Sequence, residues 1–166
     1  YNNSPDSLRA LKSFPHLTDV DLSFSGVLGD AFFGYIASLA QCKRLTRFKL
    51  DVQICNDFVS LAFRRKFCGQ FLTSSSLLKE LDLSGWIDRL DEKDWREFGK
   101  ALINAQNLQK LKTVCAVCFD ADDDDVSTHH QNLVELVCFG SAKNVASAGN
   151  RCPELRTLVI KLGGLQ

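Results

Sequence analysis

The chain has 166 residues, and its 20 Lys and Arg residues balance its 20 Asp and Glu residues, so the formal net charge is zero. A nucleic-acid-binding domain usually shows a basic excess and an acidic disordered chain shows the opposite, so this balance argues against both. Hydrophobic residues make up 45% of the chain and charged residues 24%, as in ordinary globular domains. The length is enough for one domain with a hydrophobic core.

Targeting signals and cysteines bear on where the protein works. No stretch approaches the roughly 18 consecutive apolar residues of a membrane-spanning helix, and residues 1–6 do not look like a signal peptide. The chain contains no Met, so we expect a fragment of a longer protein. Its seven Cys are an odd number, and several lie in apolar runs where a reduced thiol packs well. We predict a reducing, cytoplasmic location, although Asn2-Asn3-Ser4 matches a glycosylation triplet.

The N-terminal part of the chain predicts a helix, a strand and a second helix. Ser4-Pro5-Asp6 suits the cap and first turn of a helix that runs to about Ser13. Residues 17–22 then follow the strand pattern Leu-x-x-apolar-x-apolar. Asp30 is placed to cap the next helix, which reaches Gln41 with its apolar residues at helical spacing.

The middle of the chain repeats this order. A second strand pattern covers residues 45–50, and Asn56 is placed to cap the helix that follows it. A third strand pattern covers residues 78–83. Asp91 is placed to cap a helix that runs to about Gln106 and carries its apolar residues on one side.

The strand pattern recurs more closely toward the C-terminus, with a short helix expected between Lys143 and Asn150. The six matches start at Leu17, Leu45, Leu78, Leu108, Leu133 and Leu155. Successive starts are 22 to 33 residues apart. A near-regular period of this length is typical of repeat proteins, in which stacked units share one core.

This arrangement resembles the leucine-rich repeat family. The resemblance implies an α/β fold: a curved solenoid of about six repeats, with a parallel sheet on the concave face and helices on the convex face. The long first units look like the ribonuclease-inhibitor-like subclass, whereas Cys42-x-x-Leu45 and Cys152-x-x-Leu155 resemble the cysteine-containing subclass. We expect residues 1–166 to form a single domain that is part of a longer array. The family prefers Asn or Cys three residues after the last apolar strand position, where this chain has Ser25, Gln53, Trp86, Ala116 and Ser141.

Charged residues alternate in sign across the first four predicted strands. Strand side chains alternate between faces, so the residues between the apolar positions point to the concave face. The first such column reads Asp19, Arg47, Glu80, Lys110, Glu135 and Thr157. The second column reads Asp21, Lys49, Asp82, Lys112, Val137 and Val159. We interpret the columns as a salt-bridge ladder that sets the strand register. The alternative is a surface that binds a partner of complementary charge.

The alternation of charge stops at the fifth strand. Val137, Phe139 and Val159 are apolar at concave positions, and contiguous exposed apolar surface commonly marks a binding site. We predict that these three residues, with Lys112 and Glu135 beside them, bind a partner. The alternative is that a further repeat or a folded-back C-terminus covers them.

Two polar clusters invite a metal interpretation, and neither fits it. The acidic run 120–125 would need Gly and Glu at the sixth and twelfth positions of an EF-hand loop, where it has Asp125 and Gln131. Cys115 and Cys118 would point to opposite faces of a strand, and His129 and His130 are adjacent and would diverge, so neither a zinc site nor a redox pair is expected. A solvated loop is the simpler interpretation of the acidic run.

The remaining candidates have structural interpretations. Arg64-Arg65-Lys66 is expected to be the water-facing side of a helix, although it could meet an acidic partner. Trp86 and Trp95 are expected to pack in the interior. No Ser lies in a nucleophile motif and there are only three His, so we predict no catalytic, cofactor-binding or metal-binding residues.

These observations predict a non-catalytic module that recognises a protein partner through its concave face or its C-terminal strands. We expect no cofactor, no nucleic acid and no membrane partner, and the chain could be a subunit of a larger complex. The family resemblance leaves two alternatives open. One is the substrate-recognition part of an F-box ubiquitin ligase, and the other is a regulator of a small GTPase.

Overall fold

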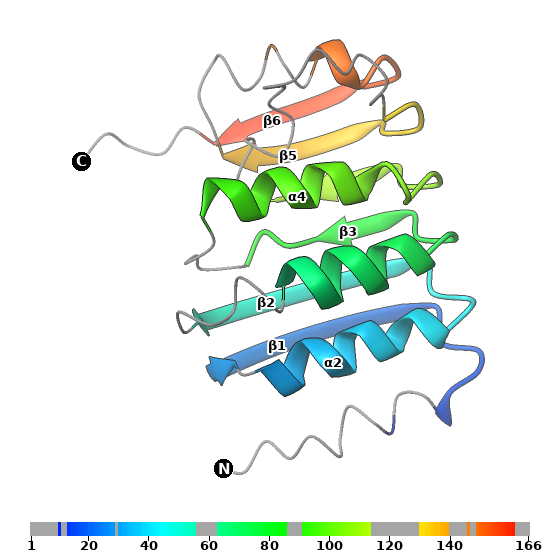
Figure 1. The fold of residues 1–166 in the computed structure, drawn as a ribbon. Helices are drawn as coiled ribbons and strands as arrows, with labels where there is room; N and C mark the ends of the chain where they lie inside the picture. The colour runs from blue at the N-terminus through cyan, green and yellow to red at the C-terminus, as the bar shows by residue number, and fades with distance from the viewer. Residues whose placement is uncertain are drawn as a thin grey trace.

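Six strands form one parallel sheet in the computed structural model of the protein (Figure 1). The structure describes residue 10 and residues 13–28, 30–55, 63–85, 91–113, 130–139, 146 and 149–161. The strands are β1 (Asp19–Leu28), β2 (Arg47–Cys55), β3 (Glu80–Asp82), β4 (Lys110–Lys112), β5 (Glu135–Phe139) and β6 (Thr157–Lys161). They lie in chain order from β1 to β6, and the sheet does not close on itself. The predicted α/β class and parallel sheet are confirmed.

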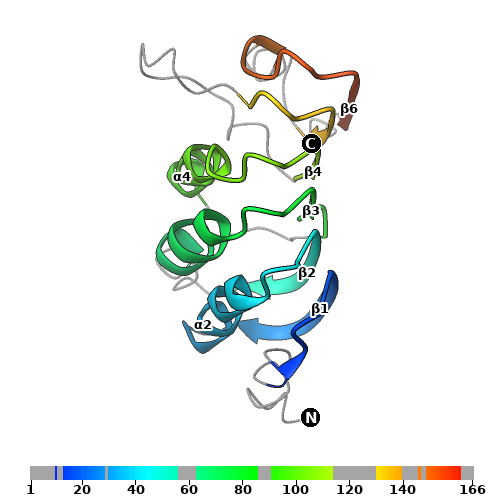
Figure 2. The same ribbon diagram turned by 90° about the vertical axis from the view of Figure 1, so that its right-hand side faces the viewer.

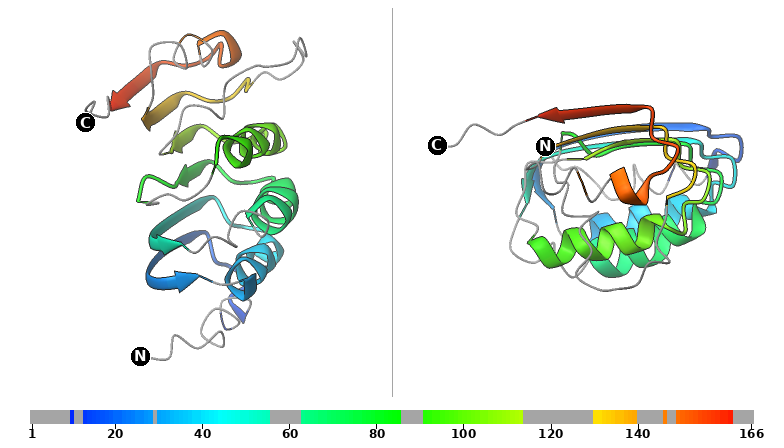
Figure 3. Two further views of the ribbon diagram at one scale, coloured as in Figure 1. Left: turned by 60° about the vertical axis from the view of Figure 1, so that its left-hand side comes forward. Right: turned by 90° about the horizontal axis from the view of Figure 1, so that it is seen from above.

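Helices cover one face of this sheet. They are α2 (Asp30–Ser38), the 3-10 turn η2 (Leu39–Gln41), the π-helix η3 (Phe63–Leu72) and α4 (Glu92–Leu102). Figure 2 and Figure 3 show these helices stacked on one side of the strands, each beside the next. We call the opposite face, which none of these helices covers, the open face.

The core lies between the sheet and the helices and is built from equivalent strand positions. Phe48, Leu81, Leu111 and Leu136 occupy the same position on neighbouring strands and are all fully or almost fully buried. Each is enclosed by a strand on either side. Leu158 holds the same position on the edge strand β6 and is 37% exposed, whereas Val20, at this position on the opposite edge strand β1, is 6% exposed.

Aromatic side chains fill the core beneath the middle strands. Ring centroids lie 4.8 Å apart for Phe48 and Phe71 and 5.3 Å apart for Phe63 and Phe67. These four rings are completely buried. Aromatic side chains bury the largest areas of any residue, so this cluster is the main apolar contact between β2 and η3.

Trp95 extends the aromatic cluster to the third helix. Its ring lies 5.6 Å from Phe98 and 5.8 Å from Phe63, and it is 1% exposed. The prediction that Trp95 packs in the interior is confirmed, whereas Trp86 lies outside the described residues.

The start of α4 is fixed by two carboxylates. The amide N–H of Asp94 donates to Asp91 Oδ1 at 2.8 Å, and the amide N–H of Asp91 donates to Asp94 Oδ2 at 3.1 Å. The predicted cap at Asp91 is therefore confirmed as a reciprocal capping box. Asp94 is buried, and its Oδ1 lies 2.9 Å from Arg64 Nε on η3.

The contact of Arg64 with Asp94 corrects one prediction. Arg64 was expected to face water with Arg65 and Lys66, but its side chain is only 29% exposed and reaches across to α4. A carboxylate buried at a helix start needs a positive partner, which the guanidinium supplies. Helical periodicity alone places Arg64 on the polar side and does not reveal the neighbouring helix.

Helix ends differ in detail from the predictions. Asp30 is the first residue of α2 rather than a residue before it, while the helical run does end at Gln41 through η2. The third helix ends at Leu102, earlier than the predicted Gln106. The amide N–H of Ala105 donates to the carbonyl of Leu102, and this tight turn brings Ala105 into the core.

Other predicted helices lie largely outside the described residues. The structure does not describe Asn56, the predicted cap of the second helix. It also leaves out most of the predicted helix that ends at Ser13 and most of the one from Lys143 to Asn150. Within the described part of the chain, no helix has the length and apolar character needed to cross a bilayer.

Replacing one ring of the aromatic cluster tests this packing. Phe67→Ala removes a fully buried ring that contacts three other rings of the cluster within 6.3 Å. We expect it to lower the free energy of unfolding by about 3–5 kcal/mol. Phe14→Ala, at an exposed position, is the matched control and should change it by less than about 0.5 kcal/mol. Urea denaturation followed by circular dichroism measures both, and equal effects would contradict the assigned core.

Candidate functional site

The open face carries the two predicted columns of charge side by side. In the parallel register, Arg47 pairs with Asp19 on one side and Glu80 on the other. Lys110 pairs with Glu80 and Glu135 in the same way. The alternation read from the sequence therefore corresponds to adjacent residues in the sheet.

Ion pairs link the first column from β1 to β5. Arg47 lies 4.0 Å from Asp19 (Nη1 to Oδ1) and 3.7 Å from Glu80 (Nε to Oε2). Lys110 Nζ lies 3.7 Å from Glu80 Oε1 and 3.9 Å from Glu135 Oε2. Each cation thus bridges two carboxylates, and the predicted ladder is confirmed in this column.

The second column forms separate pairs. Lys49 Nζ lies 3.3 Å from Asp21 Oδ2, and Lys112 Nζ lies 3.8 Å from Asp82 Oδ2. Asp82 Oδ1 also accepts a hydrogen bond from the amide of Ser84 at 3.0 Å. Exposed pairs contribute only about 0–1 kcal/mol each, so these columns favour one strand register more than they stabilise the fold.

The ladder ends where the apolar residues begin. Val137 lies beside Lys112 on one side and Val159 on the other. Val137 is half-buried and Val159 is 43% exposed. We call these two valines the valine step. Phe139 is opposite Lys161 at the end of β5, and the structure describes its backbone only.

Four of the five predicted partner-binding residues divide into two groups, and Phe139 at the end of β5 is the fifth. Lys112 and Glu135 are the last charged members of the ladder, each engaged with a residue of the preceding strand. Val137 and Val159 are adjacent on the open face, and their side chains carry no charge. The sheet brings these four residues together, because β4, β5 and β6 are consecutive.

Leu158 is an exposed residue at the same edge that the sequence pattern did not single out. It precedes Val159 on β6 and points to the helix side of the sheet. Its pattern position is that of the buried leucines, and nothing in the repeat pattern distinguishes it from them.

A cavity of ≈ 340 Å³ lies between the end of α4 and the turn before β5. Its lining includes Leu102, Leu108, Leu133, Gln106 and His130. Among the described lining residues, His130 is the one imidazole.

Buried cysteines are the other reactive groups of the described chain. The side chains of Cys42, Cys68, Cys138 and Cys152 are buried. Burial raises the pKa of the Cys152 thiol to about 12. Burial, and secondarily the nearby Glu97 and Asp94 carboxylates, also raises the pKa of Cys68 well above its ordinary value. The thiols of Cys68 and Cys152 therefore stay protonated at neutral pH and act as packing groups.

The residues that were considered as metal ligands, and rejected, lie mostly outside the described residues. The acidic run 120–125, Cys115, Cys118 and His129 all lie there. Within the described ranges, no three His, Cys, Asp or Glu side chains come together where they could hold a metal ion.

Comparison of the sequence with models of known protein families gives no match, and comparison with curated proteins gives none either.

Charge reversal at the centre of the ladder tests the first column. Arg47→Glu introduces a carboxylate between those of Asp19 and Glu80, so that three carboxylates lie side by side. We expect a loss of about 1 kcal/mol in the free energy of unfolding at low salt, and a smaller loss at high salt because screening weakens the repulsion. Arg47→Gln should cost less. Urea denaturation at two salt concentrations provides the measurement, and a salt-independent loss would argue against a charge ladder.

The raised thiol pKa values predict both reactivity and stability. In the folded chain, Cys68 and Cys152 should resist iodoacetamide at about pH 8 and react once urea unfolds it, as followed by mass spectrometry. An unfolded thiol ionises near its ordinary pKa of 9.0, while the folded one does not. The free energy of unfolding should therefore fall as the pH rises above 9.0. Rapid alkylation of the folded chain would show that these sites open readily.

Proposed function

We propose that residues 1–166 form a single domain of about six leucine-rich repeats that recognises a protein partner and has no catalytic activity of its own. Three features support this proposal. The strands follow chain order in a parallel sheet, the helices lie on one face (Figure 1), and the repeated leucine position is buried on successive strands. In such a solenoid the open face is the concave one.

The main support for partner binding is the valine step, which is the uncharged part of the open face beyond the last ion pairs of the ladder. The cations of the first four strands already have carboxylate neighbours, so they offer little to a charged partner. Burying apolar surface contributes about 25 cal/mol per Å², which makes Val137 and Val159 the favourable part of the face. A partner with an apolar side chain here would meet Lys112 and Glu135 at the rim.

The proposed setting is a reducing, cytoplasmic compartment. Four described cysteines are buried, as expected for a protein that does not rely on disulfides. The partner is proposed to be a protein, with no cofactor involved, and the chain would act as one subunit of the resulting complex.

Val159→Asp is the variant that tests the valine step. It adds a charge to the exposed apolar residue of the open face. With the chain immobilised for affinity purification and quantitative mass spectrometry, we expect partners held by the unmodified chain to be reduced at least about tenfold, because an unpaired carboxylate would have to be desolvated on binding. Phe139→Ala extends the test to the end of β5.

Ser23→Lys is the control, since it adds one charge to an exposed residue of β1 at the far end of the same face, opposite Asp51. It should leave partner capture unchanged. Circular dichroism confirms that each variant is folded. Full capture by the Val159→Asp chain, with its fold intact, would rule out the valine step as the binding site.

A further inference from the structure

The turns that lead into the strands form a continuous row along one edge of the sheet. The amide N–H of Thr46 donates to the carbonyl of Thr18 at 2.8 Å, and that of Lys79 donates to the carbonyl of Thr46 at 2.7 Å. Gln109, Val134 and Arg156 continue the row with the same hydrogen bond to the preceding turn. We call this row of turns the turn edge. It lies where the strands begin, so it is a surface separate from the valine step.

The second and third turns of this edge carry cations, and none of the first three carries a carboxylate. Turn residues 14–18, 42–46 and 75–79 include Lys43, Arg44 and Lys79 and no Asp or Glu. All three side chains are exposed, and no carboxylate lies within ion-pair distance of them among the described residues. The ladder cations on the neighbouring open face are paired, so within a chain of zero net charge this edge is a local positive excess.

Farther along the edge the excess disappears. The next two turns, residues 105–109 and 130–134, contain Gln and Asn side chains and one His. A carboxylate first occurs in the last turn, at Glu154, in a segment that also holds Arg151 and Arg156. The unbalanced Lys and Arg side chains are therefore confined to the turns before β2 and β3.

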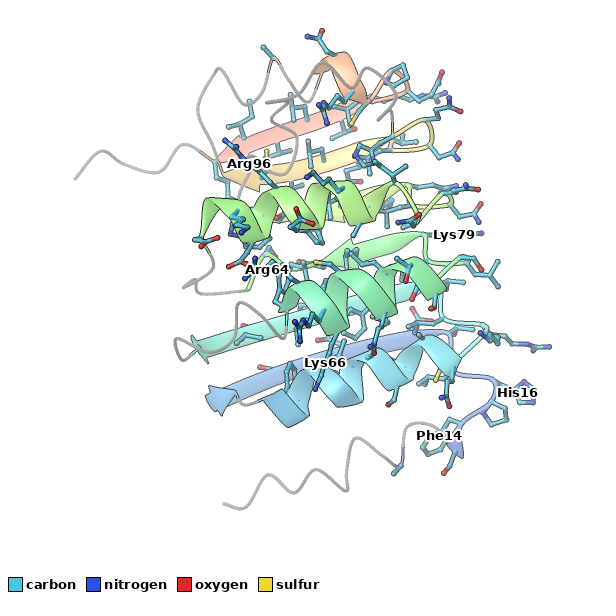
Figure 4. The ribbon with its side chains drawn as sticks, viewed as in Figure 1. Phe14, His16, Arg64, Lys66, Lys79 and Arg96 are labelled. Carbon is cyan, nitrogen blue, oxygen red and sulfur yellow. The ribbon has the colours of Figure 1, made fainter. Side chains whose placement is uncertain are left out.

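Two exposed apolar side chains lie on either side of these cations. Phe14 is 55% exposed in the first turn and Leu77 is 47% exposed in the third. Lys43 and Arg44 are in the turn between them. Neighbouring strands lie about 4.8 Å apart, so the two apolar side chains are separated by roughly 10 Å along the edge. Figure 4 shows Phe14, His16 and Lys79 at this same edge, with Lys79 pointing away from the body of the protein.

We propose that the first three turns form a second binding site, for an acidic peptide segment that also carries apolar side chains. Its carboxylates would form charge-assisted hydrogen bonds with Lys43 and Arg44. Its apolar side chains would cover Phe14 and Leu77, removing both from water. Lys79 adds a third positive charge on the far side of the central turn.

A nucleic acid fits this surface less well than a peptide does. Nucleic-acid affinity comes mainly from neutralising many phosphates along a groove, whereas this edge has three cations within a short row. Single-stranded bases bind by stacking on aromatic rings; Phe14 offers one exposed ring here, but Leu77 offers none. An aliphatic residue beside cations instead matches a peptide that mixes carboxylates with apolar groups.

Selection from a library of random peptides displayed on phage, with the full 166-residue chain as bait, tests the proposal. We expect the selected peptides to combine Asp or Glu with Leu, Ile or Phe. Their affinities, measured by fluorescence anisotropy, should fall at least about tenfold for Lys43→Glu/Arg44→Glu and several-fold for Leu77→Ala, and they should fall as salt is raised.

Lys93→Glu/Lys100→Glu is the matched control, because it changes the net charge equally on exposed positions of α4. It should leave affinity within about twofold. The proposal is overturned if no peptide is selected, if the selected peptides are not acidic, or if single-stranded RNA binds the edge more tightly than they do. Peptides that bind Lys43→Glu/Arg44→Glu normally but are lost by Val159→Asp would belong to the valine step, and that result would also overturn a site at the turn edge.

Discussion

The fold depends on each strand being buried by its neighbours. Phe48, Leu81, Leu111 and Leu136 hold one repeated position and lose almost all their exposure because a strand lies on either side. The strands and helices bury their apolar faces against one another in one core, so stability comes from the packing of adjacent elements. At the two edges of the sheet the same position differs, since Val20 on β1 is buried and Leu158 on β6 remains partly exposed.

Stacking also explains the charges. Once the apolar positions are in register, the residues between them must stand beside one another on the open face, where like charges would repel. The alternation of Asp19, Arg47, Glu80 and Lys110 meets this condition, and the ion pairs follow from it. Since each pair contributes little energy, the pattern disfavours shifted registers more than it adds stability.

The zero net charge of the chain is thus the sum over three surfaces that differ in their local charge. The ladder is neutral because acid lies beside base, the valine step is neutral because it carries no charge, and the beginning of the turn edge is positive. A partner that approaches this molecule meets little net field at the ladder. The uncompensated features lie at the two other surfaces, and the proposals rest on them for that reason.

The sequence by itself determined the α/β class, the strand positions and the two charge columns, because a repeated pattern with a period of two along each strand leaves one consistent alignment. It also located the cap at Asp91, a local interaction within one turn. Only the tertiary structure decided the role of Arg64, the exposure of Leu158 and the row of turns bearing Lys43 and Leu77. These depend on which segments become neighbours, and contacts between distant segments leave no periodic signal in the chain.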